Sequence, residues 1–292
     1  MLIRFGFDLA YELPAPTPVL LLLQLRPELA QRLRSAKEIV LRPDVNREEF
    51  LDSFGNRCLR LLAPAGGLEL SCRAVIEDSG EPAPIVADAR QHPVSELPPE
   101  VLRFLQPSRY CELELLGPLA WPQFGGAPPG WPCVQNICDW VHGHLRFDYA
   151  LARSTRTAFE AMREGVGVCR DFTHLAIAFC RCLNIPARYV AGYLGDFGVP
   201  PDDSPMDFSA WMEVYLGEAW HVFDVRHNAR RIGHLPMAWG QDASDVAITT
   251  SFGPHTLRRF SVTTEEAAET FSTGLTSEEI RRGHDGICGP RC

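Results

Sequence analysis

The sequence lacks the features that mark a membrane protein or a nucleic-acid-binding protein. Its apolar runs, such as Val19 to Leu23, are too short to cross a bilayer, and no basic segment followed by an apolar stretch opens the chain. The formal net charge is −9, and no cluster of lysine and arginine gathers on a predicted face. We therefore expect a cytoplasmic protein whose partners include neither a membrane nor a nucleic acid.

Cofactor and metal signatures are equally scarce. The ten cysteines include no Cys-x-x-Cys pair, and no glycine-rich loop of the phosphate- or dinucleotide-binding kind is present. Cys288 and Cys292, with His284, would offer ligands in a polar tail, and Asp202-Asp203 would offer two carboxylates to calcium. A tail and a solvated loop explain these residues equally well. We expect no metal, no cofactor and no disulfide framework.

The distribution of strand and helix patterns predicts an α+β protein. In residues 1–116, short runs rich in Val, Ile and Leu alternate with turn residues, which is typical of an antiparallel β-sandwich. A short helix is expected near 98–105. The runs expected as strands are 2–11, 18–25, 37–42, 57–63 and 67–77.

The second part of the chain predicts helices first and an antiparallel sheet after them. A proline- and glycine-rich linker is expected at 117–131, then a core at 132–275 and a tail at 276–292. Helices are expected near 132–146, 157–164 and 169–184. Strands are expected near 187–194, 208–216, 219–226, 246–252 and 257–263.

Cys169 is the strongest candidate for a reactive group. It follows Gly165 and Gly167 and opens an amphipathic helix. The free N–H groups at a helix N-terminus stabilise a thiolate and an oxyanion that forms beside it. The competing interpretation is a small buried residue at the start of a helix. A nucleophile also needs a base and a group that orients the base.

A hairpin at residues 206–228 is where such partners are expected. A two-residue turn at Gly217-Glu218 would place Trp211 opposite Asp224 and Ser209 diagonal to it on the same face. Strand alternation puts His221 on the face of the hairpin opposite to Asp224. The same alternation puts His227 on that opposite face too, unless the strand end twists. His174 lies on another side of its helix from Cys169 and is expected to bond the sheet or neighbouring backbone.

Several segments of this chain resemble the bacterial transglutaminase-like superfamily, from about residue 1 to 264. The resemblance implies a papain-like core with a Cys-His-Asp triad, after an N-terminal β domain. Cys169 would be the nucleophile and Asp224 the orienting acid, whereas Ser209 stands where the family has its histidine. The segments that carry the resemblance are Leu97–Cys111, Gly167–Leu175, Ile185–Tyr193, Ala210–Tyr215, Trp220–Asp224 and Asp242–Gly253.

Ser209 divides the functional expectations, because a hydroxyl cannot accept a proton at neutral pH as imidazole does. One hypothesis is a cysteine amidohydrolase or acyltransferase that acts on a peptide-like amide through a Cys169 thioester, with impaired or altered chemistry. The alternative is an inactive relative, natural or engineered, that binds a peptide or amide ligand. Trp211 and Arg226 would line the substrate site, with sheet packing and a turn as their ordinary interpretations.

Overall fold

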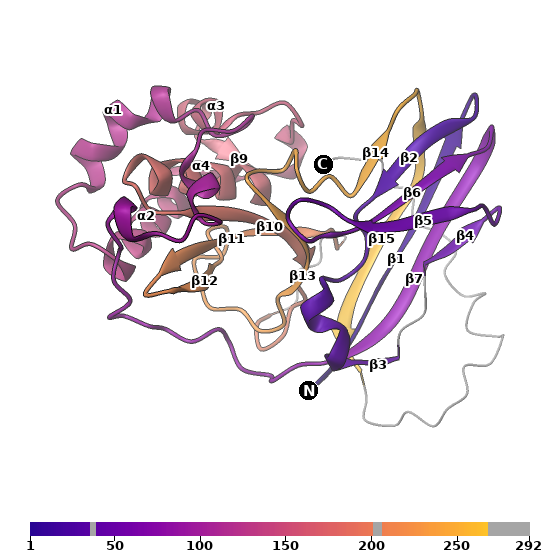
Figure 1. Cartoon of the computed structure of the whole chain (residues 1–292), viewed down its shortest axis with the longest axis horizontal. Coiled ribbons are helices and arrows are strands. Elements are labelled where there is room, and N and C mark those ends of the chain that lie inside the picture. Colours follow the sequence, from indigo (N-terminus) through magenta and orange to yellow (C-terminus); the bar gives the residue numbers. More distant parts are fainter. Residues whose placement is uncertain (36–38, 201–205, 268–292) are drawn as a thin grey trace.

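The computed structural model describes residues 1–35, 39–200 and 206–267. Figure 1 shows a β-sandwich at one end, a layer of helices at the other, and the sheet that contains β10 and β11 between them. The expected α+β class with an N-terminal β-sandwich is confirmed. No helix within the described ranges is both long and apolar enough to traverse a bilayer.

The sandwich is built from two antiparallel sheets. One has the strand order β15-β1-β7-β3, with β4 also paired to β7, and the other has the order β14-β2-β6-β5. Alternate residues of facing strands, such as Phe5, Phe7 and Leu9 of β1, are buried between the sheets. The strands are β1 (Leu2–Leu13), β2 (Thr17–Leu21), β3 (Leu33–Ser35), β4 (Val40–Arg42), β5 (Arg47–Leu51), β6 (Arg57–Ala63), β7 (Gly66–Glu77), β14 (Thr249–Ser251) and β15 (Thr256–Glu266).

The last two strands correct the expected division of the chain. Residues 246–252 and 257–263 were assigned to the core at 132–275, yet β14 pairs with β2 and β15 pairs with β1. The β1–β15 ladder runs from Ile3↔Glu266 to Glu12↔Thr256. The sandwich is thus completed by strands from the far end of the sequence, a long-range pairing that local periodicity does not encode.

The helical layer covers one face of the central sheet, whose order is β12-β11-β10-β13. Alternate β11 residues, Ala210, Met212 and Val214, are buried in one cluster with the apolar side of α4. The elements are α1 (Leu113–Phe124), α2 (Trp131–His144), α3 (Ala158–Glu164), α4 (Cys169–Cys182), β10 (Ala187–Tyr193), β11 (Ser209–Leu216), β12 (Ala219–Phe223) and β13 (Leu235–Gly240). A small parallel pair, β8 (Arg146–Phe147) and β9 (Val166–Gly167), precedes α4.

Two local expectations are corrected. The linker at 117–131 contains the second half of α1, even though Pro118 and Pro122 lie within that helix. Leu116, Ala120 and Phe124 are fully buried at a spacing of four residues, so packing offsets the hydrogen bonds that the prolines remove. At 98–105 the structure has turns and a short 3₁₀ helix, η3 (Leu102–Leu105), instead of an α-helix. Strand β13 was not predicted.

The other face of the central sheet packs against the sandwich. Tyr193, Leu235 and Met237 join the buried cluster of the sandwich. The Arg26 guanidinium lies 3.1 Å from the ring centroid of Trp239 in β13. The sheet is therefore fixed from both sides, which gives the first residues of β11 a defined position beside the start of α4.

Candidate active site

Cys169 is the first residue of α4, as the sequence predicted. The turn before it is held by Asp171, whose Oδ2 accepts a hydrogen bond of 3.0 Å from the Val168 N–H. Glycine is required at position 167, because a Cβ there would lie 2.6 Å from the Asp171 Cβ. The glycine before the cysteine thus permits the carboxylate to close the first turn of the helix.

Asp171 is a structural residue rather than a reacting one. Its side chain is fully buried, and its Oδ2 lies 3.0 Å from Nη1 of Arg156, which is itself 4% exposed. Arg170 reaches Oδ1 from the other side at 3.3 Å. This charge cluster fixes the N-terminus of α4 and therefore the position of the Cys169 sulfur.

The thiol of Cys169 lies beneath the surface, with 8% of the residue exposed. Burial raises its pKa to about 11, and the negative charge of Asp207 adds to this effect. Two features act in the opposite direction: the Ala210 N–H donates a hydrogen bond to the sulfur, and Arg226 contributes positive charge. The resting thiol is protonated at neutral pH, so an attack on a carbonyl requires a base.

Position 209 provides no such base. Ser209 begins β11 and pairs with Gly192 of β10, one residue before the Ala210 N–H that reaches the thiol. Its hydroxyl makes no hydrogen bond with any residue of the described ranges. The structure therefore places position 209 next to the residue whose N–H reaches the Cys169 sulfur, but it shows no side-chain link from position 209 to Asp224.

Asp224 follows the last residue of β12 and is buried. The predicted hairpin register is present: Tyr215 pairs with Trp220, and the ladder ends at Met212↔Phe223. Gly217 and Glu218 both have positive φ, which suits the two-residue turn. The resemblance identified the Asp224 carboxylate as the orienting acid. It lies next to the beginning of β11, the strand whose first residue is Ser209.

The carboxylate of Asp224 is already bonded to an imidazole. Its Oδ2 lies 2.7 Å from His227 Nδ1, and its Oδ1 accepts the His227 backbone N–H at 3.1 Å. His234 Nε2 approaches the same Oδ2 at 3.7 Å. Although burial acts to raise the pKa of Asp224, the hydrogen bond from His227 and the nearby His234 imidazole hold it well below its usual range.

The histidines divide into those anticipated and those missed. His174 is buried, and its Nε2 accepts the Ala243 N–H at 3.1 Å, as expected for a structural residue. His221 pairs with the Leu216 carbonyl at 3.1 Å, away from Asp224. The strand-parity argument against His227 is wrong, because β12 ends at Phe223 and the chain turns. His234 was missed, since nothing in its flanking sequence predicted β13.

The two expected substrate-binding residues differ in their surroundings. Trp211 is 1% exposed and packs edge-on against His234, so sheet packing accounts for it and no accessible surface remains. Arg226 lies with its guanidinium 3.9 Å from the ring centroid of Phe147, and its charge acts on the Cys169 thiol. Of the two residues, Arg226 is the one whose charge acts on the Cys169 thiol.

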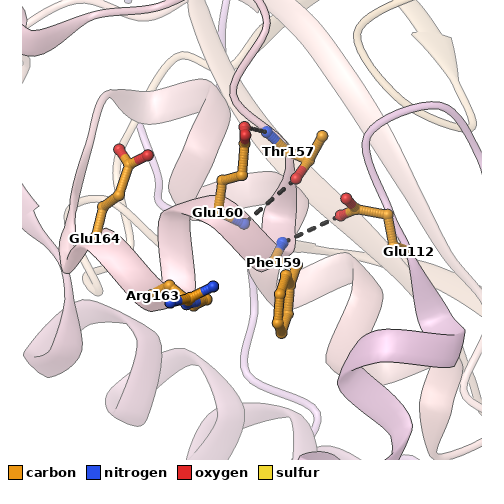
Figure 2. A pocket seen from close by; sticks show the side chains of 6 residues that line it. All are labelled: Glu112, Thr157, Phe159, Glu160, Arg163 and Glu164. Atoms are coloured by element: carbon orange, nitrogen blue, oxygen red, sulfur yellow. Dashed lines mark hydrogen bonds between the residues drawn. The ribbon is translucent and has the colours of Figure 1, made fainter.

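A surface hollow of about 570 Å³ lies along α3, apart from the residues just described. Figure 2 shows Glu112, Thr157 and Glu160 around it, with Glu112 accepting the Phe159 N–H and Glu160 capping the helix. These carboxylates have structural partners. Within the described ranges no group of three His, Cys, Asp or Glu is arranged to hold a metal. Asp202-Asp203, His284, Cys288 and Cys292 lie outside the described residues.

Comparisons with known proteins agree with this geometry. Residues 122–225 match the model of the Transglutaminase-like superfamily, a range that includes Cys169, Ser209 and Asp224. A candidate cysteine protease from Cytophaga hutchinsonii is similar in structure, with 29% sequence identity and a TM-score of 0.79 over 93% of this chain and 92% of that one. An uncharacterized protein of Mycobacterium leprae is 26% identical over 120 residues, which cover 39% of this chain and 42% of that relative.

Proposed function

The chain carries a domain of the transglutaminase-like superfamily, and on this premise we propose that it is a thiol enzyme that hydrolyses or transfers acyl groups from amides through a thioester on Cys169. The observation that carries the proposal is the placement of the Cys169 sulfur. It lies at the N-terminus of α4 and accepts the N–H of Ala210 in β11. Strand β11 pairs with β12, and Asp224 directly follows β12. Backbone N–H groups at that point stabilise a thiolate and then an oxyanion.

The reaction follows from these groups. The sulfur loses its proton to a base and attacks the carbonyl carbon of the amide, and the carbonyl electron pair moves to oxygen. Collapse of the tetrahedral intermediate breaks the C–N bond, and the amine leaves with a proton returned by the base. Water or a second amine then attacks the thioester, which gives either an acid or a new amide and frees the thiol.

The expected substrate is a peptide or a small amide-containing molecule. The positive charge of Arg226 acts on the Cys169 thiol, so this side of the site is suited to a polar or negatively polarised group of the substrate. Turnover should be slow relative to an enzyme with imidazole at position 209, because the pKa of Cys169 is about 11 and Ser209 cannot take its proton. General-base catalysis is commonly worth about 10²–10⁴-fold in rate, and Ser209→His should recover part of that factor.

The second candidate is a binding protein without turnover. The raised pKa of Cys169 and the serine at position 209 both favour it. In this case the chain would hold a peptide or amide against Cys169 and form no thioester.

Acylation by p-nitrophenyl acetate separates the two candidates, and a glutamine-containing peptide with hydroxylamine tests amide chemistry. For an enzyme, mass spectrometry should find acetyl on Cys169 and nitrophenolate release should be lost in Cys169→Ala. Cys182→Ala is the matched control, since Cys182 lies in the same helix and is more exposed than Cys169. If neither the chain nor Ser209→His acetylates Cys169, the enzymatic proposal fails and the binding protein is favoured.

A further inference from the structure

We propose that His227 is the general base of this thiol centre, taking over through its Nε2 the role that the family gives to position 209. This inference rests on the proposed function, because it identifies the group that removes the Cys169 proton. It moves the imidazole from strand β11 to the turn that follows β12, while the orienting carboxylate of Asp224 stays in place.

The hydrogen bond to Asp224 sets the tautomer of His227. An ionised carboxylate accepts, so the 2.7 Å contact places the ring proton on Nδ1. Nε2 then carries the lone pair, as a general base requires. The His227 side chain is 23% exposed, so the ring is not sealed from a bound substrate. The second bond, from the His227 backbone N–H to Oδ1, fixes the residue to the same carboxylate.

The remaining histidines of the described ranges are bonded elsewhere or enclosed. Among those residues, His227 is the one imidazole hydrogen-bonded to a carboxylate. His234 has its Nε2 buried without a hydrogen-bond partner and is packed against Trp211. The others are bonded to backbone or to a hydroxyl: His92, His142, His144, His174, His221 and His255.

The turn that carries His227 is linked to the start of α4 through its neighbour Arg226. Arg226 packs on Phe147 of β8, the strand that pairs with β9 immediately before Cys169. The charge of Arg226 acts on the Cys169 thiol. The side chain at position 209 is a serine, which is too short to occupy the place of an imidazole beside Asp224. His227 is therefore the imidazole that can serve the thiol while it is held by the acid.

The proton balance is complete without a further reactant. The S–H bond of Cys169 breaks as its proton moves to His227 Nε2, and the sulfur electron pair forms the C–S bond. The imidazolium carries one positive charge, which the Asp224 carboxylate at Nδ1 offsets. The same proton leaves with the departing amine, and His227 returns to its neutral form.

The test is the pH dependence of Cys169 alkylation by iodoacetamide, measured by peptide mass spectrometry on the full chain. A thiol that exchanges its proton with a neighbouring imidazole gives a rate that is independent of pH between neutrality and about pH 9. A thiol without such a partner gives a rate that rises tenfold per pH unit toward its pKa. We expect the plateau in the native chain, and in His227→Gln a continuous rise with a rate at pH 7 at least tenfold lower.

Three further variants make the outcome decisive. His221→Gln is the matched control, because it makes the same change on the same hairpin away from Asp224, and it should keep the plateau. Asp224→Asn should remove it, since an amide N–H directed at Nδ1 forces the proton onto Nε2. Ser209→His added to His227→Gln should restore it, which a merely misfolded His227→Gln chain would not allow.

Each result supports or overturns the proposal. A native chain without a plateau, or a plateau that persists in His227→Gln, overturns it. Alkylation does not require turnover, so a plateau that depends on His227 without any acyl transfer would leave the base assigned while the proposed enzymatic function fails. Acyl transfer that is unchanged in His227→Gln would support the enzyme and refute His227 as its base.

Discussion

Replacement of Asp171 by asparagine should destabilise the protein strongly, although Asp171 takes no part in the chemistry. The substitution keeps an oxygen for the Val168 N–H but removes the charge that faces Arg156, whose Nη1 lies 3.0 Å from Oδ2. Both side chains are almost entirely buried, at 0% and 4% exposed. Removing one member of a buried pair costs about 3–5 kcal/mol. Arg156 retains Glu164, whose Oε2 lies 2.9 Å from its Nε, so we expect the lower end of that range.

Urea unfolding followed by circular dichroism measures this loss as a lower midpoint at unchanged slope. Arg153→Ala is the control: Arg153 also pairs with carboxylates, Glu160 and Glu164, but its side chain is 42% exposed. That exposed network should contribute about 1 kcal/mol or less. If Asp171→Asn costs no more than Arg153→Ala, the buried pair does not hold the start of α4 and the account given for Gly167 and Asp171 is refuted.

Three other substitutions test the surroundings of the site. Burial lowers the pKa of His174 to about 3, so below about pH 6.5 the unfolded chain binds a proton that the folded chain excludes. This group should therefore lower the free energy of unfolding by about 1.4 kcal/mol per pH unit of acidification. In urea titrations from pH 7 to 5, His174→Gln should lose less stability than the native chain. Glu213→Gln should cost about 3 kcal/mol in the same assay, because Arg188, whose Nε lies 2.7 Å from Glu213, is buried between two tryptophans; a cost below 1 kcal/mol would contradict this. Gly192→Ala should lower the free energy of unfolding by about 1–3 kcal/mol, since its Cβ would lie 2.2 Å from the Leu235 carbonyl oxygen. An unchanged free energy of unfolding would show that the strands can separate there.

Local patterns predicted the helix start at Cys169 and the hairpin correctly. Helix α4 begins at Cys169 because two glycines and an acidic first turn define its N-terminus, and each of these signals lies within a few residues. The two-residue turn at Gly217-Glu218 fixed the β11–β12 register, which brought Asp224 beside β11. Both predictions depend on short-range geometry that a sequence displays directly.

The same reasoning failed where distant segments determine the outcome. Pro118 and Pro122 predicted a linker, but the stripe of Leu116, Ala120 and Phe124 packs into the core and keeps α1 helical. His227 was set aside because strand alternation was extended beyond Phe223, where β12 ends. The end of a strand depends on what packs against it, which a single sequence does not reveal.

The sequence by itself determined that a thiol opens helix α4 and that position 209 carries a serine, which has no imidazole to offer as a base. Only the tertiary structure decided which imidazole Asp224 holds, since His227 reaches it through a turn. It also decided that strands from both ends of the chain complete one sandwich. The physical reason is the range of the interactions: caps, turns and alternation act over a few residues, whereas a buried carboxylate selects its partner from whatever the fold brings within hydrogen-bond distance.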